Sequence, residues 1–235
     1  MTVDWLRTAF HRALITRVPR DHTEPDRAFR RRRLVVATTF LIGAGLLGVS
    51  LRVEPGDDRF YWLTALLALV WAVGGLLSGP LHLGYVQVGR RFRRPVLTPV
   101  VVGATLAVVF VVGALVIRAV PLLRGYVDDV LAYATYGNLA VVVVIAVVNG
   151  VAEELFFRGG LFAAIGRRSP VLISTVAYAL ATVATGNLML VFAAAVVGVV
   201  LGLQRRASGG ILAPVITHVT WSLLMLLLLP VLLLR

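Results

Sequence analysis

The sequence contains no cysteine and no lysine, and each absence excludes a class of chemistry. Without cysteine there are no thiol nucleophiles, disulfides, thiolate zinc sites or iron–sulfur clusters. Without lysine, all 23 permanently cationic side chains are arginines, so no side-chain amine can take part in catalysis. Charged residues are also scarce: they make up 14% of the 235 residues, and hydrophobic residues make up 59%. Soluble domains contain about 25% charged residues and about 45–50% hydrophobic residues, so the composition indicates a membrane protein.

Histidine, too, is rare, with four copies in the chain. A bound metal would therefore depend on these histidines, on carboxylates or on amides. His11 and His22 fall in the polar N-terminal region. His82 follows a Gly79-Pro80 break, and we expect it to be structural. This leaves His218 as the one histidine expected to be functional.

Long apolar runs separated by short charged stretches fill the chain from Leu34 onward. A helix needs about 20 apolar residues to cross a bilayer, and several of these runs reach or approach that length. The predicted fold is an all-α, polytopic transmembrane helix bundle that forms a single domain over residues 34–235. About seven spans are predicted, at 34–51, 60–89 with a break at Gly79-Pro80, 96–117, 138–166, 169–185, 188–204 and 210–234.

Residues 1–33 are predicted to be a basic arm that precedes the bundle. They carry nine arginines and four acids, and no apolar run long enough for a signal-peptide core. Their apolar residues recur at helical spacing, as in an amphipathic helix that lies on a membrane surface: Val3, Leu6, Phe10, Leu14 and Val18. The run Arg30 to Arg33 is then expected to meet lipid phosphates. Base-stacking aromatics and DNA-binding motifs are lacking, so the expected partners include membrane lipids but no nucleic acid.

The arginines collect in alternate loops, as the positive-inside rule requires of correctly placed spans. Eighteen of the 23 lie in the arm or in the loops on its side of the membrane. The other five lie in loops on the opposite side or at the C-terminus: Arg52, Arg59, Arg118, Arg124 and Arg235. We therefore expect a multi-pass protein of the cell membrane with a cytoplasmic N-terminus.

Two adjacent glutamates and an arginine interrupt an apolar stretch, at Glu153, Glu154 and Arg158. A charge in the middle of a membrane helix costs about 2.5–3.5 kcal/mol on insertion scales, so such groups are usually paired, buried and functional. Glu154 and Arg158 are four residues apart and can form an ion pair on one helix face. Glu153 points about 100° away. It has no such partner and can act as a general base. Alternatively, all three lie solvated at the membrane rim and only orient the span.

Distances along the chain place three side chains of different spans at a similar depth. Glu153 and Thr182 each lie 14 residues from the Arg167-Arg168 pair, and His218 lies 12 residues from Arg206. In ideal helices all three are then about 18–21 Å from the same membrane boundary. A histidine that only packs between helices is the alternative, but the shared depth favours a metal or proton site.

The polar residues on these spans, with their four-residue spacings, resemble the motifs of the CPBP family of intramembrane proteases. This family groups type II CAAX prenyl endopeptidases with bacteriocin-processing and bacteriocin-immunity proteins. The family's Glu-Glu-x-x-x-Arg is matched in full by Glu153-Glu154-Leu-Phe-Phe-Arg158. The family's Phe-x-x-x-His motif corresponds to Tyr178-Ala-Leu-Ala-Thr182 in this chain, and its His-x-x-x-Asn motif corresponds to His218-Val-Thr-Trp-Ser222. The resemblance covers about residues 138–230 and defines a protease-like core there.

In this family, as the resemblance implies, the first glutamate activates water, and histidines on separate helices help to bind zinc. Carried over, Glu153 is the general base, Glu154 and Arg158 are a supporting pair, and His218 is a Zn²⁺ ligand. Thr182 replaces the second histidine, and a hydroxyl is a poor zinc ligand beside imidazole or carboxylate. The implied zinc site is incomplete.

Two hypotheses follow from the motifs. The first is an intramembrane metalloendopeptidase of the CAAX-protease type, which cleaves a membrane-proximal peptide or protein substrate with water activated by Glu153. The second is a catalytically silent member of the family, acting as a membrane scaffold or a bacteriocin-immunity-like protein. A transporter is a third possibility, but the chain has no convincing internal repeat to support it.

Overall fold

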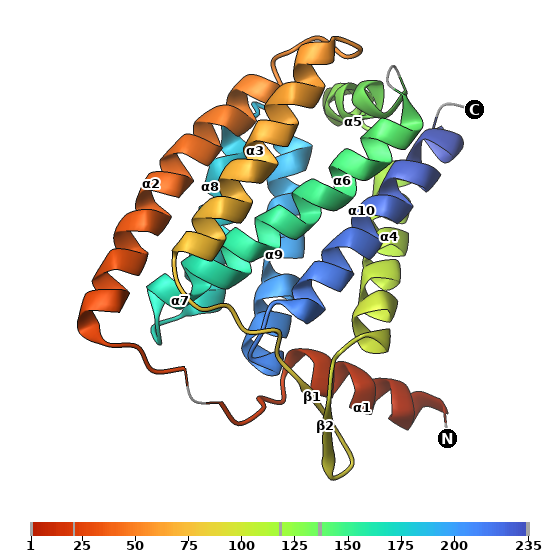
Figure 1. Cartoon of the computed structure of the whole chain (residues 1–235). Coiled ribbons are helices and arrows are strands. Elements are labelled where there is room, and N and C mark those ends of the chain that lie inside the picture. Colours follow the sequence, from red (N-terminus) through yellow and green to blue (C-terminus); the bar gives the residue numbers. More distant parts are fainter. Residues whose placement is uncertain (1, 21, 118, 136–137, 234–235) are drawn as a thin grey trace.

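A computed structural model describes residues 2–20, 22–117, 119–135 and 138–233, most of them in helices (Figure 1). Arg118, Arg235 and the side chains of Val3 and Leu6 lie outside this described part. In chain order the elements are α1 (Thr2–Leu14), α2 (Asp26–Ser50), α3 (Asp58–Leu77), β1 (Val86–Val88), β2 (Arg91–Arg93), α4 (Leu97–Ile117), α5 (Pro121–Thr135), α6 (Leu139–Glu154), the π-helix η1 (Leu155–Leu161), α7 (Phe162–Ile165), α8 (Pro170–Val183), α9 (Leu188–Ser208) and α10 (Leu212–Leu233).

Six helical segments of the described part are long and apolar enough to cross a membrane. They are α2, α3, α4, the continuous segment Leu139–Ile165, α9 and α10. The apolar helix α8 is shorter, with 14 residues, and packs against α9. The predicted all-α, multi-pass membrane bundle is confirmed, and about seven spans agrees with six long helices and one short one.

The structure differs from the predicted spans in three places. The 60–89 span ends at Leu77, because Gly79 has a φ of +140° and Pro80 has no backbone N–H to continue a helix. The rest of that stretch is an extended loop and an antiparallel β1–β2 hairpin. Residues 121–135, predicted as an outer loop, form α5. The first span begins at Asp26 rather than Leu34, since an acid in the first turn favours a helix start there.

An aromatic core joins α2, α3 and η1. Trp71 of α3 is buried, with its ring centroids 4.6 Å from Phe156 and 5.1 Å from Phe157 of η1. Gly43 of α2 faces the same tryptophan so closely that a Cβ there would lie 2.2 Å from the indole ring. On the other side, a Cβ on Gly75 of α3 would lie 2.6 Å from a backbone oxygen of η1. Small residues thus let three helices meet around one large side chain.

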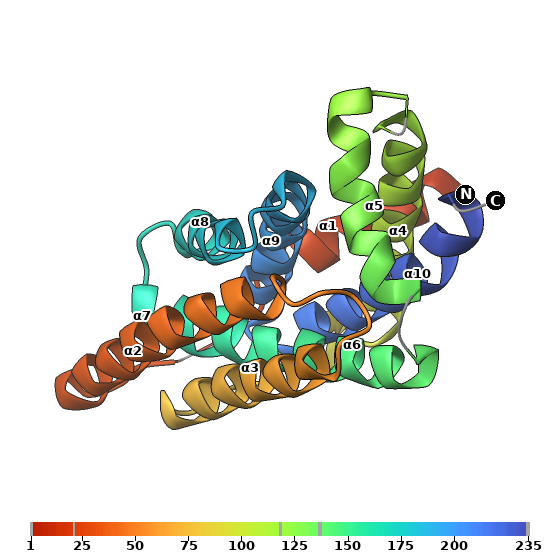
Figure 2. The same cartoon turned by 90° about the horizontal axis from the view of Figure 1, so that it is seen from above.

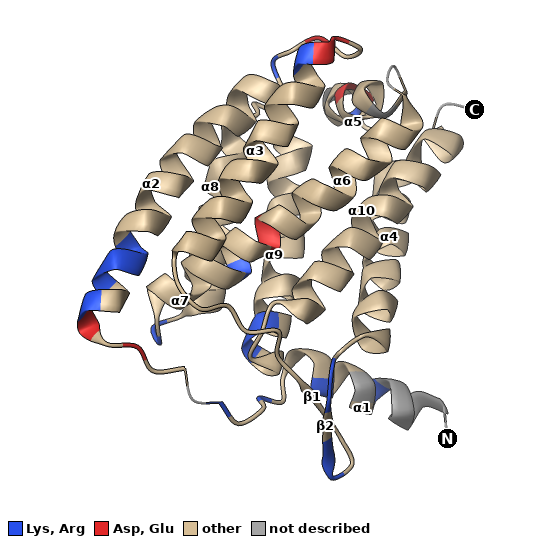
Figure 3. Ribbon diagram, viewed as in Figure 1, with Lys and Arg blue, Asp and Glu red and all other residues tan. Residues whose placement is uncertain are grey.

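The helices run side by side, with α3 and α10 on either side of α6 and α4 beyond α10 (Figures 1 and 2). Charged residues gather at the two ends of this bundle, with an acidic position about halfway along the continuous helical segment Leu139–Ile165 (Figure 3). We call one end the arginine-rich end. It comprises the β1–β2 hairpin, the loop between α7 and α8, and the end of α9, with Arg90, Arg91, Arg93, Arg94, Arg167, Arg168, Arg205 and Arg206.

Arg32 corrects the expectation that the whole run Arg30 to Arg33 meets lipid phosphates. Its side chain is 1% exposed, forms an ion pair with Glu24 and donates to Ser78 Oγ at 3.1 Å. The linker between α1 and α2 is thereby attached to the end of α3. An acid in the linker supplies the partner that buries this one arginine.

Two histidines also meet at this end of the bundle. The rings of His22 and His82 stack with centroids 3.8 Å apart. Partial burial, together with the positive charges of Arg205 and Arg32, lowers the pKa of His82, against a smaller opposing effect of Glu24. His82 is thus in contact with the linker residue His22, and its structural role stays a prediction.

Candidate functional site

The helix that carries the paired glutamates changes geometry directly after them. Asn138 caps its start by accepting hydrogen bonds from two backbone N–H groups of the first turn, at 3.0 and 3.4 Å. α6 ends at Glu154 and continues as the π-helix η1 over Leu155–Leu161. Single π-helical turns inside α-helices are frequent at functional sites. In this chain the change falls between Glu154 and Arg158.

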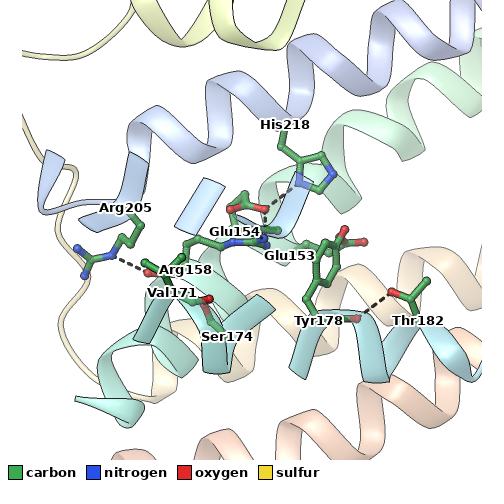
Figure 4. A network of polar contacts seen from close by, with 10 residues as sticks. Glu153, Glu154, Arg158, Val171, Ser174, Tyr178, Thr182, Arg205 and His218 are labelled. Carbon is green, nitrogen blue, oxygen red and sulfur yellow. Dashed lines mark hydrogen bonds and ion pairs between the residues drawn. The ribbon is translucent and has the colours of Figure 1, made fainter. Parts of the chain in front are cut away.

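Glu154 lies in a buried ion cluster with Arg158 and His218 (Figure 4). Arg158 Nη1 donates to Glu154 Oε1 at 2.9 Å, and His218 Nδ1 lies 2.8 Å from the same oxygen. Glu154 and Arg158 are 0% exposed and His218 is 5% exposed. The ion pair expected from the four-residue spacing is present, and the histidine of α10 is a second partner that the spacing did not indicate.

Backbone contacts at the arginine-rich end hold the start of the helix that carries His218. The N–H groups of residues 211 and 212 donate to the carbonyls of residues 82 and 83, at 2.8 and 3.1 Å. Gly210 approaches the same loop so closely that a Cβ there would lie 2.1 Å from Gly84 N. These contacts position α10, and with it the imidazole, against α6.

Arg158 is held by further contacts besides its carboxylate partner. Its guanidinium lies 4.7 Å from the ring centroid of Tyr178, and Nη2 donates to Gly198 O at 3.4 Å. Its own backbone carbonyl accepts a hydrogen bond from Arg205 Nε at 2.6 Å (Figure 4). The guanidinium is therefore fixed between α6, α8 and α9, with its ion pair directed to Glu154.

Glu153 has a different environment from its neighbour. Its Oε2 accepts a 2.6 Å hydrogen bond from the hydroxyl of Tyr178 on α8. The side chain is half-buried, whereas Glu154 is fully buried, and it forms no ion pair within the part of the chain that the structure describes. A carboxylate can accept about four hydrogen bonds. Glu153 thus retains acceptor capacity for a ligand or a water.

The two positions where the motifs depart from the family do not join this cluster. Thr182 donates its hydroxyl proton to Tyr178 O of its own helix at 2.9 Å (Figure 4). Ser222 is half-buried and forms no hydrogen bond to any residue that the structure describes. The structure therefore brings together Glu153, Glu154 and His218 with the arginine and the tyrosine, and leaves Thr182 and Ser222 outside.

These side chains do not fit the zinc ion that the family resemblance implies. Catalytic zinc usually takes three protein ligands from histidine, carboxylate or thiolate side chains. Among the described residues, no three such side chains come together as a possible metal-binding group. His218 is the one imidazole of the cluster, and its Nδ1 is bonded to Glu154. The chemistry that the site offers is that of its carboxylates and its imidazole.

Four buried polar atoms in or next to the cluster have no hydrogen-bond partner within the described part: Asn149 Oδ1, Glu154 Oε2, Arg158 Nε and Trp221 Nε1. Asn149 precedes Glu153 by four residues on α6, and Trp221 lies with its ring centroid 6.0 Å from that of His218. Two of these atoms are hydrogen-bond acceptors and two are donors. Sequence reasoning missed both Asn149 and Trp221, although their spacing places them on the same helix faces as the motif residues.

Comparison with known proteins supports the family suggested by the motifs. The model of a family described as type II CAAX prenyl endopeptidase Rce1-like matches residues 135–224. No curated protein and no solved structure matches the chain. The matched region includes all three motif steps, from Glu153 to Ser222, and confirms the resemblance.

Proposed function

Because residues 135–224 belong to the type II CAAX prenyl endopeptidase Rce1-like family, we propose that this multi-pass membrane protein is an intramembrane endopeptidase. Its substrate is a peptide segment that enters the bundle at the level of Glu153. By the positive-inside rule, the arginine-rich end and the N-terminus face the cytoplasm, in the cell membrane. The substrate then approaches from the cytoplasmic side.

The unequal environments of the two glutamates carry this proposal. Glu154 shares one oxygen with Arg158 and His218, so its charge is balanced and its position is fixed. Among the residues that the structure describes, Glu153 has one hydrogen-bond partner, the hydroxyl of Tyr178. One carboxylate is thus supporting, and the other is available to a reactant. Enzymes that use two carboxylates commonly separate their roles through such differences in environment.

These positions support a hydrolysis in which Glu153 acts as the general base. Glu153 removes a proton from a water molecule while the water oxygen attacks the carbonyl carbon of the peptide bond. Glu153 then gives that proton to the leaving nitrogen as the carbon–nitrogen bond breaks. In its protonated form, His218 donates through Nδ1 to Glu154, and its Nε2–H can donate to the oxygen that becomes negative in the tetrahedral intermediate.

Cleavage by the purified full-length protein in liposomes tests this proposal. Membrane-anchored peptides, with and without a prenylated cysteine near the C-terminus, are incubated with the protein, and products are identified by mass spectrometry. Glu153→Gln is expected to reduce cleavage about 10²–10⁴-fold, the usual effect of a general base. His218→Ala should also strongly reduce cleavage. Glu54→Gln, an exposed isosteric control, should retain full activity. Retained cleavage in both site variants contradicts the proposal.

A second candidate function is favoured by Thr182, whose hydroxyl is used within its own helix and not in the cluster. In a catalytically silent member of the family, the same side chains would hold a peptide without cutting it. Wild-type protein would then retain peptides but release no products. It would bind no zinc, whereas Thr182→His would gain one zinc per chain by elemental analysis. Products that disappear in Glu153→Gln exclude this candidate.

A further inference from the structure

Helix α1 and the β1–β2 hairpin form a separate surface at the arginine-rich end (Figure 1). α1 lies across the ends of α4 and α9 and contacts β1. The residues after it are attached to α9: Val18 N donates to Ala207 O at 3.0 Å, and Arg20 Nη1 donates to Arg206 O at 2.8 Å. The surface is therefore part of the folded protein and far along the chain from the glutamate motif.

A cavity of about 530 Å³ lies between α1 and the hairpin. Its walls combine the second half of α1, the following turn and the hairpin, with the residues Arg7, Thr8, His11, Arg12, Thr16, Val18, Gln87 and Gly89. A phospholipid headgroup is a small polar group that such a volume can accept. The glutamate site and the proposed protease reaction use none of these residues.

The lining of this cavity is basic. Arg7 and Arg12 are exposed and form no ion pair within the part of the chain that the structure describes, and none of the lining residues is acidic. The imidazole of His11 is bonded through Nδ1 to Thr16 Oγ1 at 3.1 Å, which fixes its orientation toward the cavity wall. Guanidinium groups bind phosphate through paired N–H donors. The lining is thus suited to a phosphate group.

The surroundings of the cavity add further positive charge. Hairpin arginines Arg90 and Arg91 follow the cavity residue Gly89 directly. Burial, together with the positive charges of Arg17 and Arg206, lowers the pKa of Arg20, next to the cavity in the chain. An anion bound here would reduce this like-charge repulsion.

Exposed apolar side chains beside the cavity indicate that the phosphate is carried by a lipid. Ile15 after α1 is 56% exposed, and Val88 and Phe92 of the hairpin are 48% and 53% exposed. Such residues next to basic ones are typical of surfaces that insert into the boundary between headgroups and acyl chains. They belong to the two segments that form the cavity, although none of them lines it. A free phosphate in solution would leave them in water.

We infer that the cavity between α1 and the hairpin binds the phosphate group of an anionic phospholipid from the arginine-rich side of the membrane. Arg7 and Arg12 bind the phosphate, and the apolar side chains of Ile15 and Phe92 contact the lipid beside it. The bound lipid joins α1 to the hairpin. This inference does not depend on the proposed protease activity.

Lipid retention by the purified full-length protein tests the inference. The protein in neutral detergent is titrated with phosphatidylglycerol or phosphatidylcholine, and bound lipids are counted by native mass spectrometry. The wild type is expected to retain one phosphatidylglycerol in preference to phosphatidylcholine. The double variant Arg7→Gln with Arg12→Gln should weaken this binding roughly tenfold or more, since each arginine near an anionic headgroup contributes to binding. Gln87→Trp, which fills the cavity and keeps every charge, should weaken it as well.

The matched control is Arg167→Gln with Arg168→Gln, which removes the same charge from exposed positions at the same end of the bundle but outside the cavity. It should bind phosphatidylglycerol as the wild type does. Equal weakening in both double variants, or full binding by Gln87→Trp, would show diffuse surface attraction and overturn the inference. Glycerol 3-phosphate that binds as tightly as the lipid would also overturn it, because the ligand would then come from solution.

Discussion

Replacing Glu154 with leucine should destabilise the protein severely, because it leaves two buried groups without their shared partner. Arg158 is 0% exposed, and its one ion pair in the described part is the 2.9 Å contact with Glu154. His218 loses the oxygen that lies 2.8 Å from its Nδ1. Removing one member of a buried ion pair usually costs about 3–5 kcal/mol, since the other charge stays buried and unpaired. We expect Glu154→Leu to reach this range.

Arg158→Leu in the same background shows whether the loss comes from the unpaired cation. Once Glu154 is gone, removing Arg158 takes away the unpaired charge and should recover part of the stability. The sum of the stability losses of the two single variants should then exceed the stability loss of the double variant by about 2 kcal/mol. This difference is within the range of coupling energies for contacting pairs.

Thermal unfolding in detergent, followed by circular dichroism, measures both quantities. For a chain of this size a loss of 1 kcal/mol lowers the midpoint by about 2–4 °C, so Glu154→Leu should lower it by roughly 6–20 °C. Glu54→Leu, at an exposed position, should stay within about 0.5 kcal/mol of the wild type. A loss below 1 kcal/mol for Glu154→Leu, or strictly additive losses, would refute the reasoning about the buried pair.

Three further predictions concern other parts of the bundle. Gly43→Ala should cost about 1–3 kcal/mol, because its Cβ would lie 2.2 Å from the Trp71 ring. Gly45→Ala on the same helix, with no atom within 4 Å of the new Cβ, should be neutral or stabilising in the same unfolding assay. His82 has a lowered pKa in the folded state, so the unfolded state binds more protons and stability falls as the pH drops below about 6.5. His82→Gln should make that fall shallower, as measured by the unfolding midpoint between pH 8 and pH 5. Tyr133→Phe removes the hydroxyl that donates to Leu51 O and Val53 O (3.1 and 2.6 Å) and should cost about 1 kcal/mol. Hydrogen exchange should increase in the loop between α2 and α3, and unchanged exchange there would contradict this.

The main features of the fold could be predicted because they depend on hydrophobic length and on the placement of arginine. Both properties are local, so α4, α9 and α10 lie close to their predicted spans. The β1–β2 hairpin could not be predicted, since the apolar residues before it continue the pattern of the preceding span. The burial of Arg32 could not be predicted either, because it depends on how the linker folds back to bring Glu24 alongside.

The candidate site was predictable along one helix but not between helices. The Glu154–Arg158 pair follows from a four-residue spacing. Depth along a helix also follows from spacing, but the structure brings Tyr178 of α8, and not Thr182, to Glu153. The rotation of each helix about its own axis could not be predicted from the sequence. Helices that are apolar on all faces have no amphipathic pattern to show which face packs against a neighbour. One position along a helix changes the direction of a side chain by about 100°. This is why the sequence did not indicate that His218 meets Glu154 or that Tyr178 bonds Glu153.

The π-helix has a consequence for how this chain can change in evolution. A π-helical turn accommodates one more residue than an α-helical turn does. Deleting a single residue within Leu155–Leu161 would remove this extra residue and let α6 run on as a regular α-helix, with the following residues in nearly the same rotation. A deletion before Arg158 would shorten its four-residue spacing from Glu154, and a deletion after Arg158 would displace Gly159 or Gly160, which now fit closely against Leu81 and Ser78. We therefore expect the segment to accept substitutions at its half-buried positions, yet to keep its length unchanged among related sequences.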